Sequence, residues 1–113
     1  MQVSKEFSQI LIDYAEVIVE QAKKLEGKPG AVVFFEEGDD LMVFPLKKTE
    51  LLNMRSSLEW ELGRDGCQML EKTIKEYTLD KQIVVGWFRD TKLKPNLQAI
   101  QYSVAAVELR SPH

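Results

Sequence analysis

Histidine occurs once in this chain, as the last residue, His113. Histidine supplies most general bases and many metal ligands, because its unperturbed pKa lies nearest to physiological pH. The chain therefore contains no internal Ser-His-Asp or Cys-His arrangement and no paired-histidine metal motif. Nucleotide-binding glycine motifs and Cys-x-x-Cys pairs are also absent. We expect no catalytic residue, no metal site and no bound cofactor.

Two other groups of reactive or charged side chains have a structural interpretation. Cys67 lies in the first turn of a predicted helix, where the helix dipole favours a thiolate. The same position belongs to an apolar seam with Leu70 and Ile74, which favours a buried thiol in the core. Residues 36–40 place four acids within five positions but lack the closing glutamate of a calcium loop. We expect a solvated hairpin turn there.

Trp60 is the candidate for contact with another protein. In a continuous helix over residues 49–62, it projects about 180° away from the apolar side, since successive residues turn by about 100°. Tryptophan and arginine are enriched at binding hot spots. The candidate partner-binding residues on this polar face are Trp60, Arg64, Asn53 and Ser57. The alternative is that Trp60 packs against a second surface of its own chain.

Aromatic residues and one arginine form a second candidate site. Between the sheet and the helices they would line an apolar pocket with a polar anchor, the usual form of a small-molecule site. The ligand-pocket candidates are Trp87, Arg89, Phe44 and Tyr102, beside Phe34 and Phe88. The alternative is that these aromatic side chains are simply core.

Composition limits the class of protein. The 113 residues suit one domain, residues 1–113, and 44% hydrophobic with 29% charged residues is typical of a globular chain. A net charge of −3 argues against a nucleic-acid partner, which requires clustered lysine and arginine. No stretch is long and apolar enough to span a bilayer, and the first residues lack the features of a signal peptide. Together with a lone cysteine, these features predict a cytoplasmic protein that does not bind membranes.

Hydrophobic periodicity in the first half predicts one long helix and a hairpin. Apolar residues recur at helical spacing over residues 4–26, and Gly27 and Pro29 end that helix. Two short apolar runs, residues 31–35 and 41–46, flank the acidic turn and are typical of a β-hairpin.

The second half predicts two helices and two further strands. Helical spacing returns over residues 49–62 and again over residues 67–77, and residues 83–89 form a strand. Residues 90–96 are expected to form a polar loop. Residues 97–109 fit either a helix or a strand, and the lack of charge before Glu108 favours a strand.

These elements predict an α+β fold with a four-stranded, mainly antiparallel sheet and helices on one face. Residues 31–35 are apolar on both alternating sets of positions, and so are residues 83–88. Since one sheet face would then be only partly covered, we expect the chain to form a homo-oligomer, most simply a dimer. The predicted function is an acidic, non-catalytic cytosolic protein-interaction domain with an unidentified protein partner. The alternative is a small-molecule-binding domain or a histidine-independent enzyme with an aromatic-lined pocket.

Overall fold

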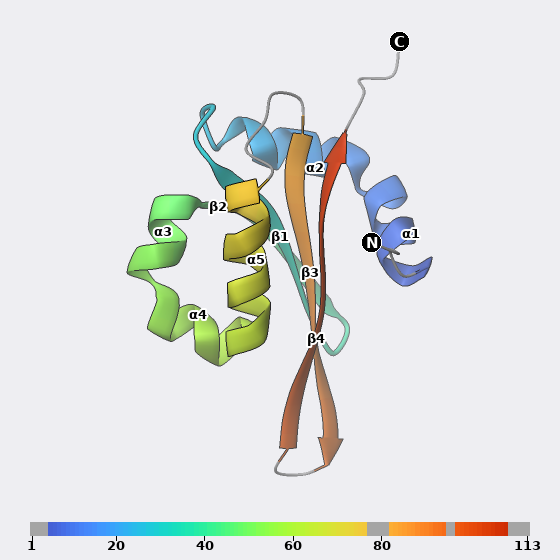
Figure 1. The fold of residues 1–113 in the computed structure, drawn as a ribbon. Coiled ribbons are helices and arrows are strands. Elements are labelled where there is room, and N and C mark those ends of the chain that lie inside the picture. The colour runs from blue at the N-terminus through green and yellow to red at the C-terminus, as the bar shows by residue number, and fades with distance from the viewer. Residues whose placement is uncertain (1–4, 77–81, 95–96, 109–113) are drawn as a thin grey trace.

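The protein is an α+β fold of helices around a four-stranded sheet (Figure 1). The computed structural model describes residues 5–76, 82–94 and 97–108. In chain order the elements are α1 (Lys5–Asp13), α2 (Ala15–Lys23), β1 (Gly30–Glu37), β2 (Asp40–Lys47), α3 (Lys48–Asn53), α4 (Arg55–Leu62), α5 (Arg64–Glu76), β3 (Gln82–Lys94) and β4 (Leu97–Glu108).

The strands lie in the order β2-β1-β3-β4, so that β2 and β4 are the two edges. The β1–β2 and β3–β4 pairs are antiparallel, which confirms the mainly antiparallel prediction. The central β1–β3 pair is parallel, because the connection through α3, α4 and α5 returns the chain to the same end of the sheet. The sheet is therefore mixed.

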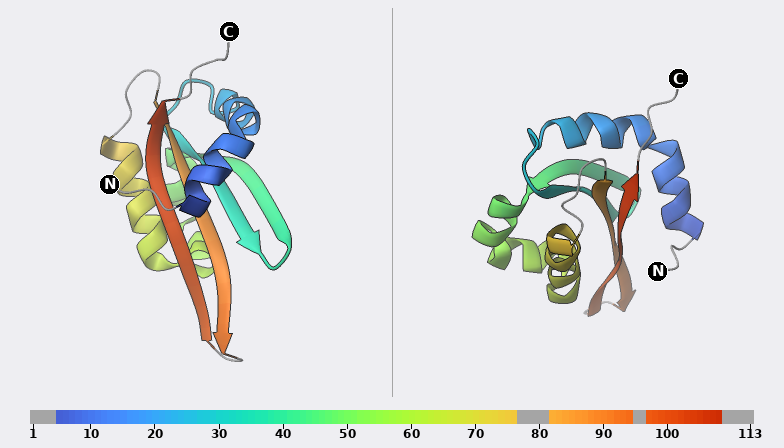
Figure 2. Two further views of the ribbon diagram at one scale, coloured as in Figure 1. Left: turned by 90° about the vertical axis from the view of Figure 1, so that its right-hand side faces the viewer. Right: turned by 45° about the horizontal axis from the view of Figure 1, so that its top comes forward.

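Helices cover both faces of the sheet, and the prediction of helices on one face is wrong. Alternate residues of β1 belong to two separate cores. Ala31 and Val33 pack with α3, α4 and α5 on what we call the α5 face. Val32 and Phe34 pack with α1 and α2 on the α2 face. The right-hand view in Figure 2 shows the two helical layers with the sheet between them.

This arrangement explains the strands that are apolar on both alternating sets of residues. A strand covered on both faces requires apolar side chains at every position, and β1 is buried from Ala31 to Phe35. The second cover comes from α1 and α2 of the same chain. The apolar pattern of β1 and β3 therefore no longer argues for a second subunit.

The predicted N-terminal helix over residues 4–26 is divided at Tyr14 into α1 and α2. The backbone of Tyr14 leaves helical geometry, with φ −111° and ψ 22°, although its N–H still donates to the carbonyl of Ile10. The change of direction lets Phe7 and Ile18 both reach the α2 face (Figure 1). Packing on a twisted sheet thus overrides a continuous helical pattern.

The predicted helix over residues 49–62 is likewise divided, at Met54, into α3 and α4. Gly63, with φ 79°, then separates α4 from α5, which begins at Arg64 rather than at residue 67. The strand alternative for residues 97–109 is correct for Leu97–Glu108. The predicted loop over residues 90–96 is wrong up to Lys94, because β3 continues that far and pairs with β4.

The β3–β4 pair extends past the rest of the sheet. β1 pairs with β3 only as far as the Glu37–Asp90 position, whereas β3 and β4 continue together to Lys94 and Leu97. Figure 1 shows this ribbon projecting beyond the helices. Within the described residues, no helix is long and apolar enough to cross a membrane.

Candidate functional site

The outer edge of β4 is one of the two edges of the sheet. β4 pairs with β3 from the Gln82–Glu108 position onward, and no described strand pairs with its other side. Alternate residues of an edge strand direct their N–H and C=O groups away from the sheet. The left-hand view in Figure 2 looks onto this side, with α5 to one side of β4 and α1 to the other.

The two edges of the sheet differ in how they are protected against pairing. Natural proteins protect edge strands with charges, prolines or bulges. β2 carries Pro45, which has no N–H to donate, and charged residues at both ends, Asp40 and Lys47. β4 carries neither a proline nor a charge from Leu97 to Val107. The β4 edge is therefore the one suited to accept another strand.

An open groove of about 460 Å³ lies against this edge. Trp87 and Arg89 of β3 lie on the α2 face of the sheet, and residues 100–103 of β4 line the groove beside them. Its lining consists of Glu6, Trp87, Arg89, Ile100, Gln101, Tyr102 and Ser103. Two of these side chains are charged, one acidic on α1 and one basic on β3.

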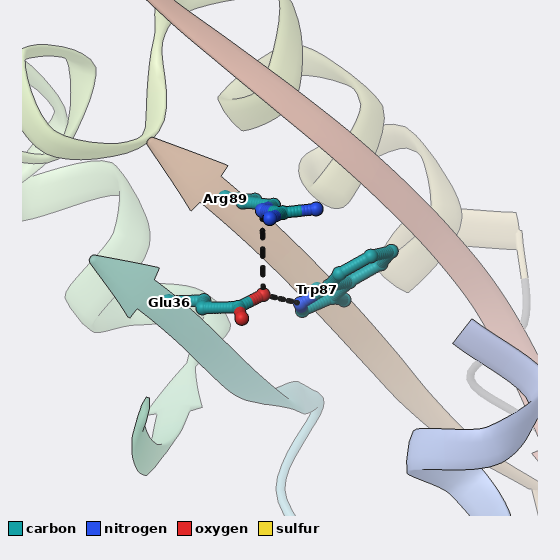
Figure 3. A network of polar contacts seen from close by, with 3 residues as sticks. All are labelled: Glu36, Trp87 and Arg89. Atoms are coloured by element: carbon teal, nitrogen blue, oxygen red, sulfur yellow. Dashed lines mark hydrogen bonds and ion pairs between the residues drawn. The ribbon is translucent and has the colours of Figure 1, made fainter. Parts of the chain in front are cut away.

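A small polar network fixes the α2 side of the groove (Figure 3). The indole Nε1 of Trp87 donates a hydrogen bond of 3.3 Å to Oε2 of Glu36 on β1. Nε of Arg89 lies 3.8 Å from the same oxygen. The carboxylate of Glu36 therefore contacts the guanidinium at Nε, the nitrogen nearest the side-chain stem. The arginine side chain is 49% exposed.

Aromatic packing supports two of the residues that line the groove, Trp87 and Tyr102. The ring of Trp87 stacks on Phe7 of α1, with a centroid distance of 6.4 Å. Tyr102, which is 37% exposed, stacks on the fully buried ring of Phe88 at 6.1 Å. Each of these two aromatic side chains therefore rests on a buried one, and this limits its freedom before any partner binds.

The structure brings together three of the four predicted pocket residues. Trp87, Arg89 and Tyr102 line the groove, but Phe44 does not. Phe44 lies on β2 opposite Val33 and packs against the core of the α5 face, two strands away from β3. The predicted position between the sheet and the helices is also wrong, because Phe34 and Phe88 fill that space and are fully buried.

The predicted partner-binding residues are distributed over three helices. Asn53 ends α3, Ser57 belongs to α4 and Arg64 begins α5; all three are exposed. The break at Met54 removes the single helical face on which the prediction depended. The side chain of Trp60 lies outside the part of the chain that the structure describes, so its role stays a prediction.

The remaining sequence candidates are structural. Cys67 is 2% exposed and packs in the core of the α5 face, as the buried-thiol interpretation predicts. The acidic hairpin is tighter than expected, because Glu37 pairs with Asp40 across a loop of Gly38 and Asp39. Among the described residues, no group of three or more histidine, cysteine, aspartate or glutamate side chains could hold a metal ion.

Sequence reasoning missed Glu6, Glu36, Ile100, Gln101 and Ser103 as parts of the site. Their assignment required the register of β1, β3 and β4, which brings together residues far apart in the chain. One signal was present, namely the uncharged run from Leu97 to Val107. The lack of charge indicated a strand. Because this strand lies at an edge of the sheet, the same lack of charge also leaves the edge unprotected against pairing with another strand.

The chain matches no protein-family model, no curated protein and no solved structure. The candidate function is therefore inferred from the geometry of the β4 edge and the groove.

Proposed function

We propose that this protein is a non-catalytic protein-interaction domain that binds an extended protein segment along the outer edge of β4. The observation that carries the proposal is the unprotected edge from Leu97 to Val107, next to a groove whose side chains are already positioned. In this mode of recognition, main-chain hydrogen bonds provide affinity, and pockets for alternate side chains provide specificity.

The groove supplies the specificity. Tyr102 offers an aromatic surface on the α5 side, and Trp87 offers one on the α2 side. The side chain of Arg89 is 49% exposed, so its guanidinium can bind a carboxylate or a main-chain carbonyl of the partner. An extended segment with apolar side chains and one acceptor for Arg89 fits these features.

The net charge and the single thiol bear on the class of partner and on the cellular compartment that we propose. A net charge of −3 disfavours nucleic acid as the partner. The single buried thiol suits a reducing compartment such as the cytoplasm. The proposal includes no membrane-bound role.

The second candidate function is binding of a small molecule, or histidine-independent catalysis, in the same groove. The volume of about 460 Å³ is the observation that favours it, because ligand sites commonly enclose about 300 to 1,000 Å³. Such sites bury most of the ligand surface, whereas this groove is open along the strand. The geometry therefore supports an extended protein segment better than a compact ligand.

Selection from a library of random peptides tests the proposed function. The peptides are displayed on phage and selected on the wild-type protein, and binding of each selected peptide is then compared with binding to Gln101→Lys. Gln101 is exposed on the β4 edge, so the substitution adds a charge to the edge without disturbing the core. Met42→Lys is the matched control, because Met42 is exposed on the β2 edge.

We expect selected peptides to bind Met42→Lys like the wild type and Gln101→Lys at least about tenfold more weakly. Amide chemical-shift changes on binding should concentrate in residues 100–104 and at the Trp87 indole. If the chain is monomeric and no peptide is selected, or if selected peptides bind the two variants equally, the β4 edge is not the binding surface.

A further inference from the structure

We infer that the extended segment bound at the β4 edge is β4 of a second copy of this chain, paired antiparallel about a two-fold axis at Tyr102. This inference rests on the proposed function, since it names the partner of the same edge. A two-fold axis makes both sides of an interface identical, so the strand must be complementary to itself.

The distribution of charge in β4 supports pairing with itself. Across a two-fold axis, the residue on the axis lies directly opposite its own copy and the residues beside it lie diagonally across from theirs, so a charge at these positions meets a like charge and is destabilising. Residues 97–107 carry no charge, although 29% of the whole chain is charged. A foreign partner would not require this, because opposite charges across a mixed interface attract.

The same run of residues defines the register. Its midpoint is Tyr102, and centring the axis there places Leu97 opposite Val107 of the second copy, so the whole uncharged run pairs with itself. Glu108 then falls beyond the central pairs. Within β4, a shift in either direction would shorten the uncharged overlap.

The pairs formed at the centre suit the side chains on each face. On the α5 face, Tyr102 lies opposite Tyr102 of the second copy, and Ile100 lies opposite Val104. On the α2 face, Gln101 lies opposite Ser103 of the second copy, a polar pair beside Arg89. Aromatic and β-branched cross-strand pairs stabilise antiparallel sheets, and Tyr102 loses exposed surface.

The helices leave room for this arrangement. The left-hand view in Figure 2 shows α5 and α1 on opposite sides of β4 rather than over its length. Antiparallel pairing about an axis perpendicular to the sheet keeps like faces together, so each helical layer continues into that of the second copy. Two four-stranded sheets then form one continuous sheet.

Light scattering and sedimentation of the full chain test the assembly. In the micromolar range, we expect twice the chain mass of 13.0 kDa. Gln101→Lys places two lysines diagonally across the axis, so we expect the dimer dissociation constant to rise at least about tenfold. Met42→Lys should remain dimeric. Thermal melting of each variant establishes that it is folded before its mass is interpreted.

Cysteine cross-linking tests the register. In Tyr102→Cys, the two introduced thiols face each other at the axis, and we expect a covalent dimer under mild oxidation. In Glu108→Cys, the two thiols would be about 40 Å apart, at about 3.3 Å per residue, and should not cross-link within the dimer. Cys67 is buried and should contribute little to cross-linking in either variant.

A wild-type mass of one chain across the micromolar range would overturn the inference. Dissociation caused by Met42→Lys instead of Gln101→Lys, or cross-linking by Glu108→Cys in preference to Tyr102→Cys, would do the same. The proposed function fails separately, when the chain is monomeric and no selected peptide distinguishes the β4 edge. A monomer that still selects such peptides contradicts only the identity of the partner as a second copy.

Discussion

Phe88 is the residue that supports Tyr102 on the α5 face. Its ring is fully buried beneath Tyr102 and lies between two glycines. A Cβ built on Gly66 of α5 would stand 2.5 Å from Phe88 Cε2, and one on Gly86 would stand 2.8 Å from Cε1. Both glycines therefore make space for the ring, and neither contact tolerates a methyl group without movement of the ring.

We expect Gly66→Ala to destabilise the protein by about 1 to 3 kcal/mol, as other overpacked cores do. The sign is informative, because alanine replacing glycine within a helix otherwise stabilises it by up to about 1 kcal/mol. Denaturant unfolding measures the change. Gln68→Ala, at an exposed position in the same helix, is the control and should change stability by less than about 0.5 kcal/mol. A stabilised Gly66→Ala would show that the ring does not occupy this space.

The contact between Glu36 and Arg89 contributes orientation more than stability. Both side chains are partly exposed, at 30% and 49%, and exposed ion pairs contribute at most about 1 kcal/mol. The carboxylate also accepts the indole N–H of Trp87, so a single group on β1 positions two side chains of β3. Its role is to set the direction of the guanidinium on the α2 side of the groove.

Among the elements, α1 completes the α2 face and one wall of the groove. It turns away from α2 at Tyr14, whose ring contacts Phe34 at a centroid distance of 5.6 Å. Phe7, 1% exposed, is the residue by which α1 is anchored on Trp87. Ile12 of the same helix is 70% exposed and lies off the contact surface.

We expect Phe7→Ala to destabilise the protein by about 3 to 5 kcal/mol, the usual cost of removing a buried phenylalanine ring. Ile12→Ala should lie within about 0.5 kcal/mol of the wild type, because its side chain is largely in solvent. Denaturant melts of both variants provide the comparison. Equal effects at the two positions would contradict the placement of α1 against the sheet.

At the scale of the whole molecule, one strand joins two cores. β1 contributes Val33 to the core of the α5 face and Val32 to the core of the α2 face, and both side chains are fully buried. Consecutive side chains of β1 pack in opposite cores. Unfolding of either core would therefore remove packing contacts that hold β1 in place for the other core. The two layers should therefore unfold together.

We expect Val32→Ala and Val33→Ala each to lower the free energy of unfolding by about 2 kcal/mol, through lost apolar burial and a residual cavity. Each variant should keep a single transition, with far-ultraviolet circular dichroism and tryptophan fluorescence changing together. All samples are compared at one protein concentration, because self-association raises apparent stability. Separate transitions, with only one shifted in each variant, would mean that the two layers fold independently.

Local pattern in the sequence was enough to predict much of the fold. Alternating or continuous apolar runs predicted β1, β2 and β3, and the burial of both faces of β1 is visible in residues 31–35. The uncharged residues 97–107 favoured a strand, and the seam around Cys67 predicted a buried thiol. These features follow from periodicity and burial, which depend on neighbours along the chain.

Only the tertiary structure decided what covers each face and which residues meet. The breaks at Tyr14 and Met54 contain no glycine or proline, so their cause is packing rather than local propensity. The parallel β1–β3 register joins Glu36 to Trp87 and Arg89 across some fifty residues of chain. The uncharged strand β4 is a candidate interface only because it lies at an edge of the sheet. That position is set by the order of the strands, which depends on long-range pairing that no local pattern encodes.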